Sequence, residues 1–103
     1  MLMSEIETLV AELAGVHRSG GGAEPLRWNY RGRLVARQVD DTHLVIRADF
    51  DYRDVLVRAH PNTFTVPNRF RKHMMVVADV ADGNRDAIDD ALTAAWRLQR
   101  EAD

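Results

Sequence analysis

The residues best suited to binding chemistry form a short basic segment in the second half of the chain. Arg69, Arg71 and Lys72 place three cations within four residues, and His73 follows them directly. Arginine and lysine bind phosphate through charged hydrogen bonds, and Phe70 between them could stack on a nucleobase. The segment is therefore either a loop that contacts a nucleic acid or an ordinary solvated loop whose Phe70 packs on the core.

A second group of cations falls on predicted strands. Its members are Arg27, Arg31, Arg33, Arg37 and Arg47. Because side chains alternate between the two faces of a strand, Arg33 and Arg37 should point the same way, opposite to Leu34 and Ala36. The group predicts either a basic sheet face that attracts anions or a polar outer face that is neutralised by nearby acids.

No spacing in the chain predicts catalysis or a metal site. The four histidines (His17, His43, His60 and His73) show no ligand-pair spacing, and the chain has no cysteine. The aspartates between residues 49 and 54 lack the glycine and glutamate of a calcium loop. No serine or threonine sits in a nucleophile elbow. We therefore expect a non-enzymatic protein with neither a metal nor a cofactor.

Apolar periodicity predicts three helices, over residues 4–16, 52–59 and 85–100. Ser4 and Glu7 are spaced as a capping box for the first helix. Asp49 or Asp51 can cap the second helix, and Asn84 can cap the third. The glycines at 20–22 predict a flexible connector after the first helix.

Alternating or continuous apolar stretches predict five strands, over residues 26–30, 34–39, 43–48, 64–66 and 74–80. Short connections between successive strands predict antiparallel pairing. The chain of 103 residues is then a single α+β domain, residues 1–103, with a five-stranded antiparallel sheet. Its expected element order is α-β-β-β-α-β-β-α.

The charge of the chain is unevenly distributed along the sequence. The net charge is −2, yet residues 25–48 carry five arginines against two aspartates, and residues 66–78 carry three cations and no acid. Both ends of the chain are acidic. If the two basic stretches share one face, that face would attract an anion despite the negative total.

Several segments form an ordered series with characteristic spacing. They are Trp28-x-Tyr30-Arg31-Gly32-Arg33-Leu34, Leu44-Val45-Ile46-Arg47, His60-Pro61, Phe64-Thr65-Val66-Pro67, Met75-Val76-Val77 and Ala95-Trp96-Arg97-Leu98. This series resembles the MmcQ/YjbR-like family of small bacterial proteins. The resemblance implies a fold of the same α-β-β-β-α-β-β-α order, likened to secretion-chaperone-like and double-wing-like domains. It also implies DNA binding, the label that the family commonly carries. After Pro67, where relatives often have a glycine or an aromatic residue, this chain has extra cations.

We therefore expect a small cytoplasmic binding protein that engages DNA. Phosphate contacts would come from Arg31, Arg33, Arg69, Arg71 and Lys72. The alternative is a protein-interaction or chaperone-like module that docks a peptide or a second copy through the sheet face or the region of Phe70 and Met75. A third interpretation, a small-molecule pocket protein, requires a cleft that a sequence cannot show. No membrane partner is expected, because no apolar run approaches the roughly 18 residues of a membrane span.

Overall fold

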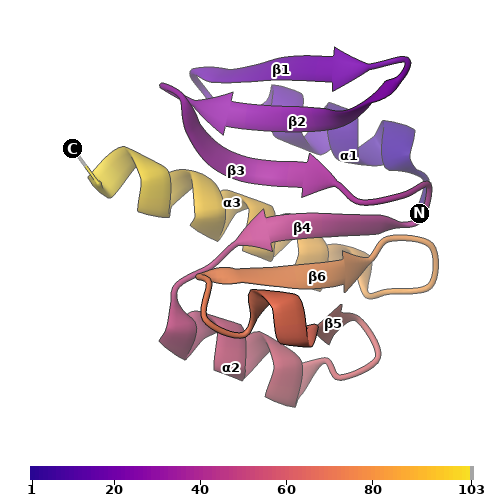
Figure 1. Cartoon of the computed structure of the whole chain (residues 1–103), viewed down its shortest axis with the longest axis vertical. Helices are drawn as coiled ribbons and strands as arrows, with labels where there is room; N and C mark the ends of the chain where they lie inside the picture. Colours follow the sequence, from indigo (N-terminus) through magenta and orange to yellow (C-terminus); the bar gives the residue numbers. More distant parts are fainter. Residues whose placement is uncertain (103) are drawn as a thin grey trace.

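Six strands form one antiparallel sheet, and three α-helices accompany it (Figure 1). The computed structural model describes residues 1–102. In chain order the elements are α1 (Met3–Ala11), β1 (Val16–Gly21), β2 (Glu24–Tyr30), β3 (Arg33–Gln38), β4 (His43–Arg47), α2 (Phe50–Ala59), β5 (Phe64–Thr65), the 3-10 turn η1 (Asn68–Phe70), β6 (Met75–Asp79) and α3 (Arg85–Glu101). The α+β class is confirmed.

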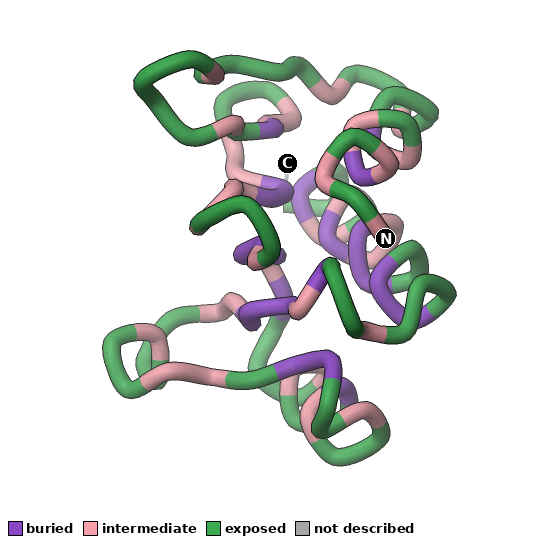
Figure 2. The backbone as a smooth tube through the Cα atoms, turned by 90° about the vertical axis from the view of Figure 1, so that its right-hand side faces the viewer, coloured by how far each residue is buried: buried purple, intermediate pink, exposed green. Residues whose placement is uncertain are grey.

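The two faces of the sheet have different surroundings. The strand order is β1-β2-β3-β4-β6-β5, and α1 and α3 lie behind the sheet in Figure 1. Trp28, Ala36, Ile46 and Val76 are partners across four neighbouring strands, and all belong to the buried core shared with the helices. Figure 2 shows the buried stretches gathered between the strands and these helices. Within residues 1–102, the opposite face of the sheet, here called the open face, carries no α-helix.

The prediction of five strands is wrong, because the first helix is shorter than its periodicity suggests. Helix α1 ends at Ala11, and residues 16–21 form β1 instead of a connector. Gly15 adopts φ +79°, in the left-handed region where a helix cannot continue. At Gly20 a Cβ would come within 2.0 Å of the carbonyl oxygen of Pro25. The glycine run therefore forms a tight hairpin between β1 and β2. The element order is the predicted one with one strand, β1, added after the first helix.

The helix starts follow local side-chain chemistry. Asp49 accepts a hydrogen bond from the backbone N–H of Tyr52 at 2.8 Å, which confirms Asp49 as the cap of α2. Asn84 caps α3 in the same way. The capping box predicted from Ser4 and Glu7 is wrong, because the cap of α1 lies two residues earlier, at Leu2: the Glu5 carboxylate accepts from the N–H of Leu2 at 2.6 Å.

A β-bulge interrupts the pairing of β2 with β3. Trp28 is the partner of Ala36, whereas Asn29 is the partner of Leu34, so Val35 is an extra residue on β3. Val35 and Ala36 are both fully buried in the core. An extra residue shifts the alternation of side chains by one position. Every β3 residue before the bulge therefore faces the side opposite to the one that simple alternation predicts.

The bulge reverses the orientation of Arg33. The prediction that Arg33 and Arg37 point the same way is wrong: Arg33 faces the helices, where its Nη1 donates to the carbonyl oxygen of Gln99 at 3.1 Å. Gln99 in turn donates from Nε2 to the carbonyl oxygen of Leu34 at 2.6 Å. This explains why a glutamine occupies a buried position on α3. It satisfies a backbone acceptor beside the bulge.

Candidate nucleic-acid interface

The basic loop from Asn68 to His73 is organised around one arginine of α2. The Nη1 atom of Arg53 donates to the carbonyl oxygens of His73, Arg71 and Phe70, at 2.8, 3.2 and 3.4 Å. Because these carbonyls converge on Arg53, the loop is held with its backbone oxygens turned towards α2. The cationic side chains of the loop are exposed: Arg69, Arg71 and Lys72.

Arg53 itself is a largely buried cation, with 11% of its side chain exposed. Its guanidinium lies 4.9 Å from the centre of the Phe50 ring, and the Asp54 carboxylate is 4.0 Å from Nε. Within residues 1–102, that Nε atom has no hydrogen-bond partner. The sequence analysis did not single out Arg53. The sequence predicts that Arg53 lies on a helix, but it does not show that Arg53 binds the carbonyl oxygens of a loop about 20 residues later.

Three arginines lie on the open face of the sheet. Arg27 on β2 and Arg37 on β3 are direct cross-strand partners, and Arg37 is in turn the partner of Val45 on β4. Arg47 lies two residues beyond Val45 and therefore on the same face. Like charges directly opposite each other destabilise a sheet. Val45 on the same face is fully buried, although it lies outside the core that the sheet shares with the helices. Long arginine side chains can cover such an apolar surface with their stems.

The basic loop joins this row of arginines at one end. Arg47 is the cross-strand partner of Met75, and the next residue, Ala48, donates from its N–H to the carbonyl oxygen of Met74 at 3.0 Å. Figures 1 and 2 place η1 on the side of the sheet opposite α1 and α3. Loop and strands therefore share one surface. We name it the basic band: Arg27, Arg37, Arg47, Arg69, Arg71 and Lys72.

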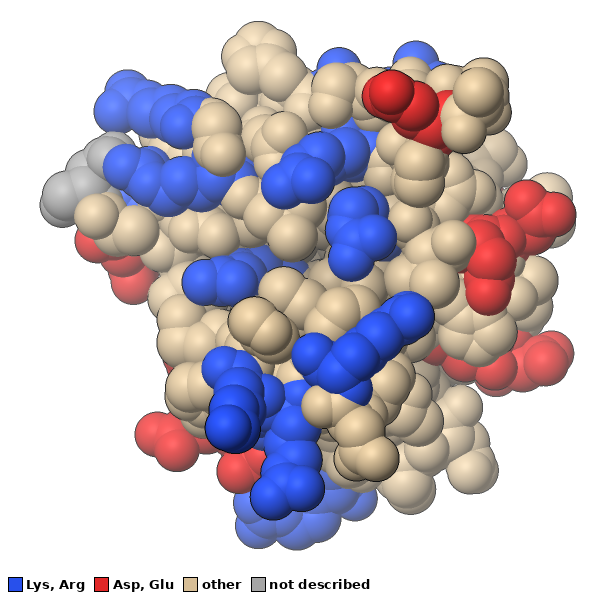
Figure 3. Space-filling view, in the orientation of Figure 1, with Lys and Arg blue, Asp and Glu red and all other residues tan. Residues whose placement is uncertain are grey.

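The basic band has few acids near it. Within residues 1–102, none of its six cations forms an ion pair with a carboxylate. Eight acids lie on helices instead: Glu5, Glu7, Asp51, Asp54, Asp86, Asp89, Asp90 and Glu101. In Figure 3, which views the open face, lysines and arginines gather across the surface, and aspartates and glutamates lie at its margins.

One end of the open face is acidic. Asp79 on β6 is the partner of His43 on β4, and Asp40 lies 2.9 Å from the Nδ1 atom of that histidine. A hydrogen bond from the backbone of Thr42, followed by one from His43, lowers the pKa of Asp40 below its usual range. Asp40 therefore keeps its charge at neutral pH, and this acidic end limits the basic surface to the opposite end of the strands.

The structure divides the five residues predicted to bind nucleic acid between two places. Arg69, Arg71 and Lys72 lie together in the loop, beside the open face. Arg31 and Arg33 lie at the β2–β3 turn, near the last turn of α3. Arg27, Arg37 and Arg47, which the sequence analysis left between two interpretations, are the strand residues that accompany the loop.

The region of Phe70 and Met75 is only half-exposed. The guanidinium of Arg69 lies 4.7 Å from the centre of the Phe70 ring, so a base could stack there only beside or in place of that arginine. Met75 lies on the open face, next to Arg47. The large apolar side chains that are exposed are elsewhere, at Leu2, Phe50 and Val55.

Within residues 1–102, no three His, Cys, Asp or Glu side chains are grouped so that they could hold a metal ion. In the same range, no helix is long and apolar enough to cross a membrane. Comparison of the chain with protein-family models, with curated proteins and with solved structures found no match.

Proposed function

We propose that this protein binds nucleic acid through the basic band and carries out no chemistry there. The observation that carries the proposal is the direct cross-strand pairing of Arg27 with Arg37 on a face that no α-helix of residues 1–102 covers. Such a pair costs stability in the free protein, and among the described residues Arg27 has no closer polar contact than a 3.4 Å hydrogen bond to Asn29. A ligand with regularly spaced phosphates would remove that cost by placing anions between the arginines.

The side chains of the open face favour contact with phosphates over contact with bases. The aromatic rings of the central strands, Trp28 and Tyr30, pack towards the helices, and Phe64 on β5 is fully buried. Proteins that hold single strands stack bases on exposed aromatic rings, and the open strands offer none. We therefore propose a duplex ligand, bound without strong sequence preference. The sheet face, in a molecule of 31 × 30 × 25 Å, would cover about nine base pairs at 3.4 Å each.

The resemblance of the segments from Trp28 to Leu98 to the MmcQ/YjbR-like family supports the same function, since that family is commonly labelled DNA-binding. We propose that the chain is a member with one additional strand, β1. The surface proposed here differs from the prediction in the residues outside the basic loop. Arg31 and Arg33 leave it, and the strand arginines Arg27, Arg37 and Arg47 join it.

The proposal is tested by the salt dependence of binding to a fluorescent mixed-sequence duplex. Each neutralised phosphate contributes about 0.9 to the slope of log K against log salt. Six contacts predict a slope of about −5 and an affinity roughly 10³-fold lower at 200 mM than at 50 mM salt. Arg37→Ala should make the slope shallower by about 1, and the double change Arg69→Ala with Arg71→Ala by about 2.

The matched control is Arg85→Ala, which changes the net charge by the same amount. Arg85 lies on α3 and pairs with Glu5 of α1, on the helix side of the sheet. Its loss should leave the slope unchanged. A slope near zero, or equal losses from Arg85→Ala and Arg37→Ala, would refute the proposal. The protein-interaction alternative would then be favoured, and it is tested by measuring the oligomeric state as a function of concentration.

A further inference from the structure

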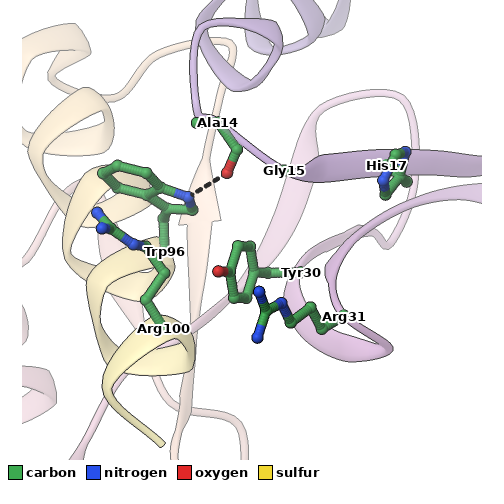
Figure 4. Close-up of a pocket in the computed structure, with 7 residues that line it drawn as sticks. All are labelled: Ala14, Gly15, His17, Tyr30, Arg31, Trp96 and Arg100. Carbon is green, nitrogen blue, oxygen red and sulfur yellow. Dashed lines mark hydrogen bonds between the residues drawn. The ribbon is translucent and has the colours of Figure 1, made fainter. Parts of the chain in front are cut away.

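A second cationic feature lies away from the basic band, between the α1–β1 turn, the β2–β3 turn and the last turns of α3 (Figure 4). It is a hollow of about 440 Å³, and a hollow of about 450 Å³ adjoins it through three shared residues. The first is lined by Ala14, Gly15, His17, Tyr30, Arg31, Trp96 and Arg100, and the second adds Arg97 and Glu101. We name the two together the Tyr30–Trp96 pocket. Their size is that of a small-molecule site.

The two aromatic walls of the pocket are fixed before any ligand arrives. The indole Nε1 of Trp96 donates to the carbonyl oxygen of Ala14 at 2.8 Å. Across the hollow, the backbone of Gly15 comes so close to the Tyr30 ring that a Cβ there would lie 2.9 Å from Cε2. The α1–β1 turn therefore contacts both rings. A pre-formed site loses little entropy when a ligand binds.

Three arginines and one glutamate line the pocket. The Arg100 guanidinium lies 4.3 Å from the centre of a Trp96 ring, and that of Arg31 lies 5.5 Å from the centre of the Tyr30 ring. Arg97 and Arg100 are exposed, and neither pairs with a carboxylate within residues 1–102. A guanidinium that lies over a ring still presents N–H groups at its edge, which is the geometry that binds a phosphate in bidentate fashion.

We propose that the Tyr30–Trp96 pocket binds a small organic phosphate, with the phosphate group on Arg97 and Arg100 and the organic part between Tyr30 and Trp96, beside the arginines that lie over these rings. The arginines supply the charge for a phosphate monoester. The rings supply an apolar surface that inorganic phosphate would leave unused. The site is independent of duplex binding, because its two α3 arginines lie on the helix side of the sheet and outside the basic band.

The probes are adenosine monophosphate, adenosine and inorganic phosphate, each titrated into the ¹⁵N-labelled full chain. The indole N–H of Trp96 is the reporter, because Trp28 is 2% exposed and should not respond. Adenosine monophosphate should shift the Trp96 signal and bind at least about 10-fold more tightly than either other probe. Equal binding of adenosine would overturn the role of the arginines. Equal binding of phosphate would overturn the role of the rings.

Two variants separate this proposal from the preceding one. Arg97→Ala with Arg100→Ala should weaken the binding of adenosine monophosphate by at least about 10-fold and leave the slope for duplex binding unchanged. Arg37→Ala should make the slope for duplex binding shallower and leave the binding of adenosine monophosphate unchanged. Adenosine monophosphate that binds the double variant as well as the original chain, or that fails to shift Trp96 at all, would refute the pocket. Neither result would bear on the proposal that the basic band binds a duplex.

Discussion

Removal of the Arg53 side chain should release the basic loop from α2. The bond to the carbonyl oxygen of His73, at 2.8 Å, has optimal length, whereas the contacts at 3.2 and 3.4 Å are long and share the same nitrogen. One hydrogen bond from a charged donor contributes about 1.5–3 kcal/mol. The contact with the half-exposed Phe50 ring adds about 0.5–1 kcal/mol. Arg53→Ala should therefore lower the free energy of unfolding by about 2–4 kcal/mol.

The free energy of unfolding is measured by urea denaturation of the variant and the original chain. Since a domain of this size has about 5–15 kcal/mol of stability, the variant should remain folded at low urea. Arg53→Lys keeps the charge and can reach one carbonyl, so it should lose about half as much. Arg58→Ala is the control. It removes an exposed arginine of the same helix and should cost at most about 1 kcal/mol.

Hydrogen exchange gives the local readout. The amides of Phe70, Arg71 and His73 form hydrogen bonds inside the loop, to the carbonyl oxygens of Pro67, Asn68 and Phe70. They should exchange faster in Arg53→Ala than in Arg58→Ala, because the loop then opens without unfolding of the core. A loss below about 0.5 kcal/mol together with unchanged exchange would show that water replaces Arg53 at no cost. The argument that Arg53 holds the loop would then be wrong.

Three further predictions concern the residues that hold the fold together. Gln99→Ala should cost about 1–3 kcal/mol in urea denaturation, because a backbone carbonyl beside the bulge loses its 2.6 Å donor. Burial, and then the negative charge of Asp90, raise the pKa of Tyr52 above its ordinary value of 10.0. Stability should be complete below pH 10 and fall as the pH rises through the raised pKa, and Tyr52→Phe should remove this part of the alkaline loss in denaturation curves across pH. Gly15→Ala should cost about 1–3 kcal/mol in thermal unfolding, because φ is +79° and the new Cβ would lie 2.9 Å from Tyr30. If Gln99→Ala or Gly15→Ala is as stable as the original chain, the contact on which that prediction rests does not contribute to stability.

The parts of the fold that depend on local chemistry were predictable from the sequence. Asn84 and Asp49 are caps whose effect extends over three residues, and both occur where the pattern placed them. The strands from Leu26 onwards lie where their apolar stretches predicted them, although the bulge interrupts the alternation of β3. The last helix begins at Arg85 as predicted, and its predicted end at residue 100 is within one residue of the observed end.

The errors arose where a local pattern fits two structures. Leu13 and Val16 continue the apolar spacing of α1, yet Gly15 between them turns the chain, and the residues that follow pair with β2. Glycine is common in both connectors and tight hairpins, so the residues 20–22 alone did not identify β1. A bulge such as the one at Val35 depends on how many residues of β2 face β3, which no single strand reveals.

The candidate site was predicted in its loop and only partly in its strands, for the same reason. Arg69, Arg71 and Lys72 are adjacent in sequence, so any loop conformation keeps them together. Whether a strand arginine joins them depends on the face it occupies, and the bulge changes that face for Arg33. Arg53 was missed because its partners are backbone carbonyls, which leave no mark in the residue types of the loop.

The bulge also separates the two anion-binding surfaces that we propose. With regular alternation through β3, Arg33 would add to the charge on the open face that already carries Arg27 and Arg37. One inserted residue places it beside the end of α3 instead, where its charge faces the carbonyl of Gln99 and suits the negative end of the helix dipole. Eight of the sixteen acids lie on the helices, and in Figure 3 the acids lie at the margins of the open face. A duplex that approaches the open face therefore meets cations, and one that approaches α1 or α3 meets carboxylates. The uneven distribution of charge thus lets a polyanion bind on the open face although the net charge of the chain is −2.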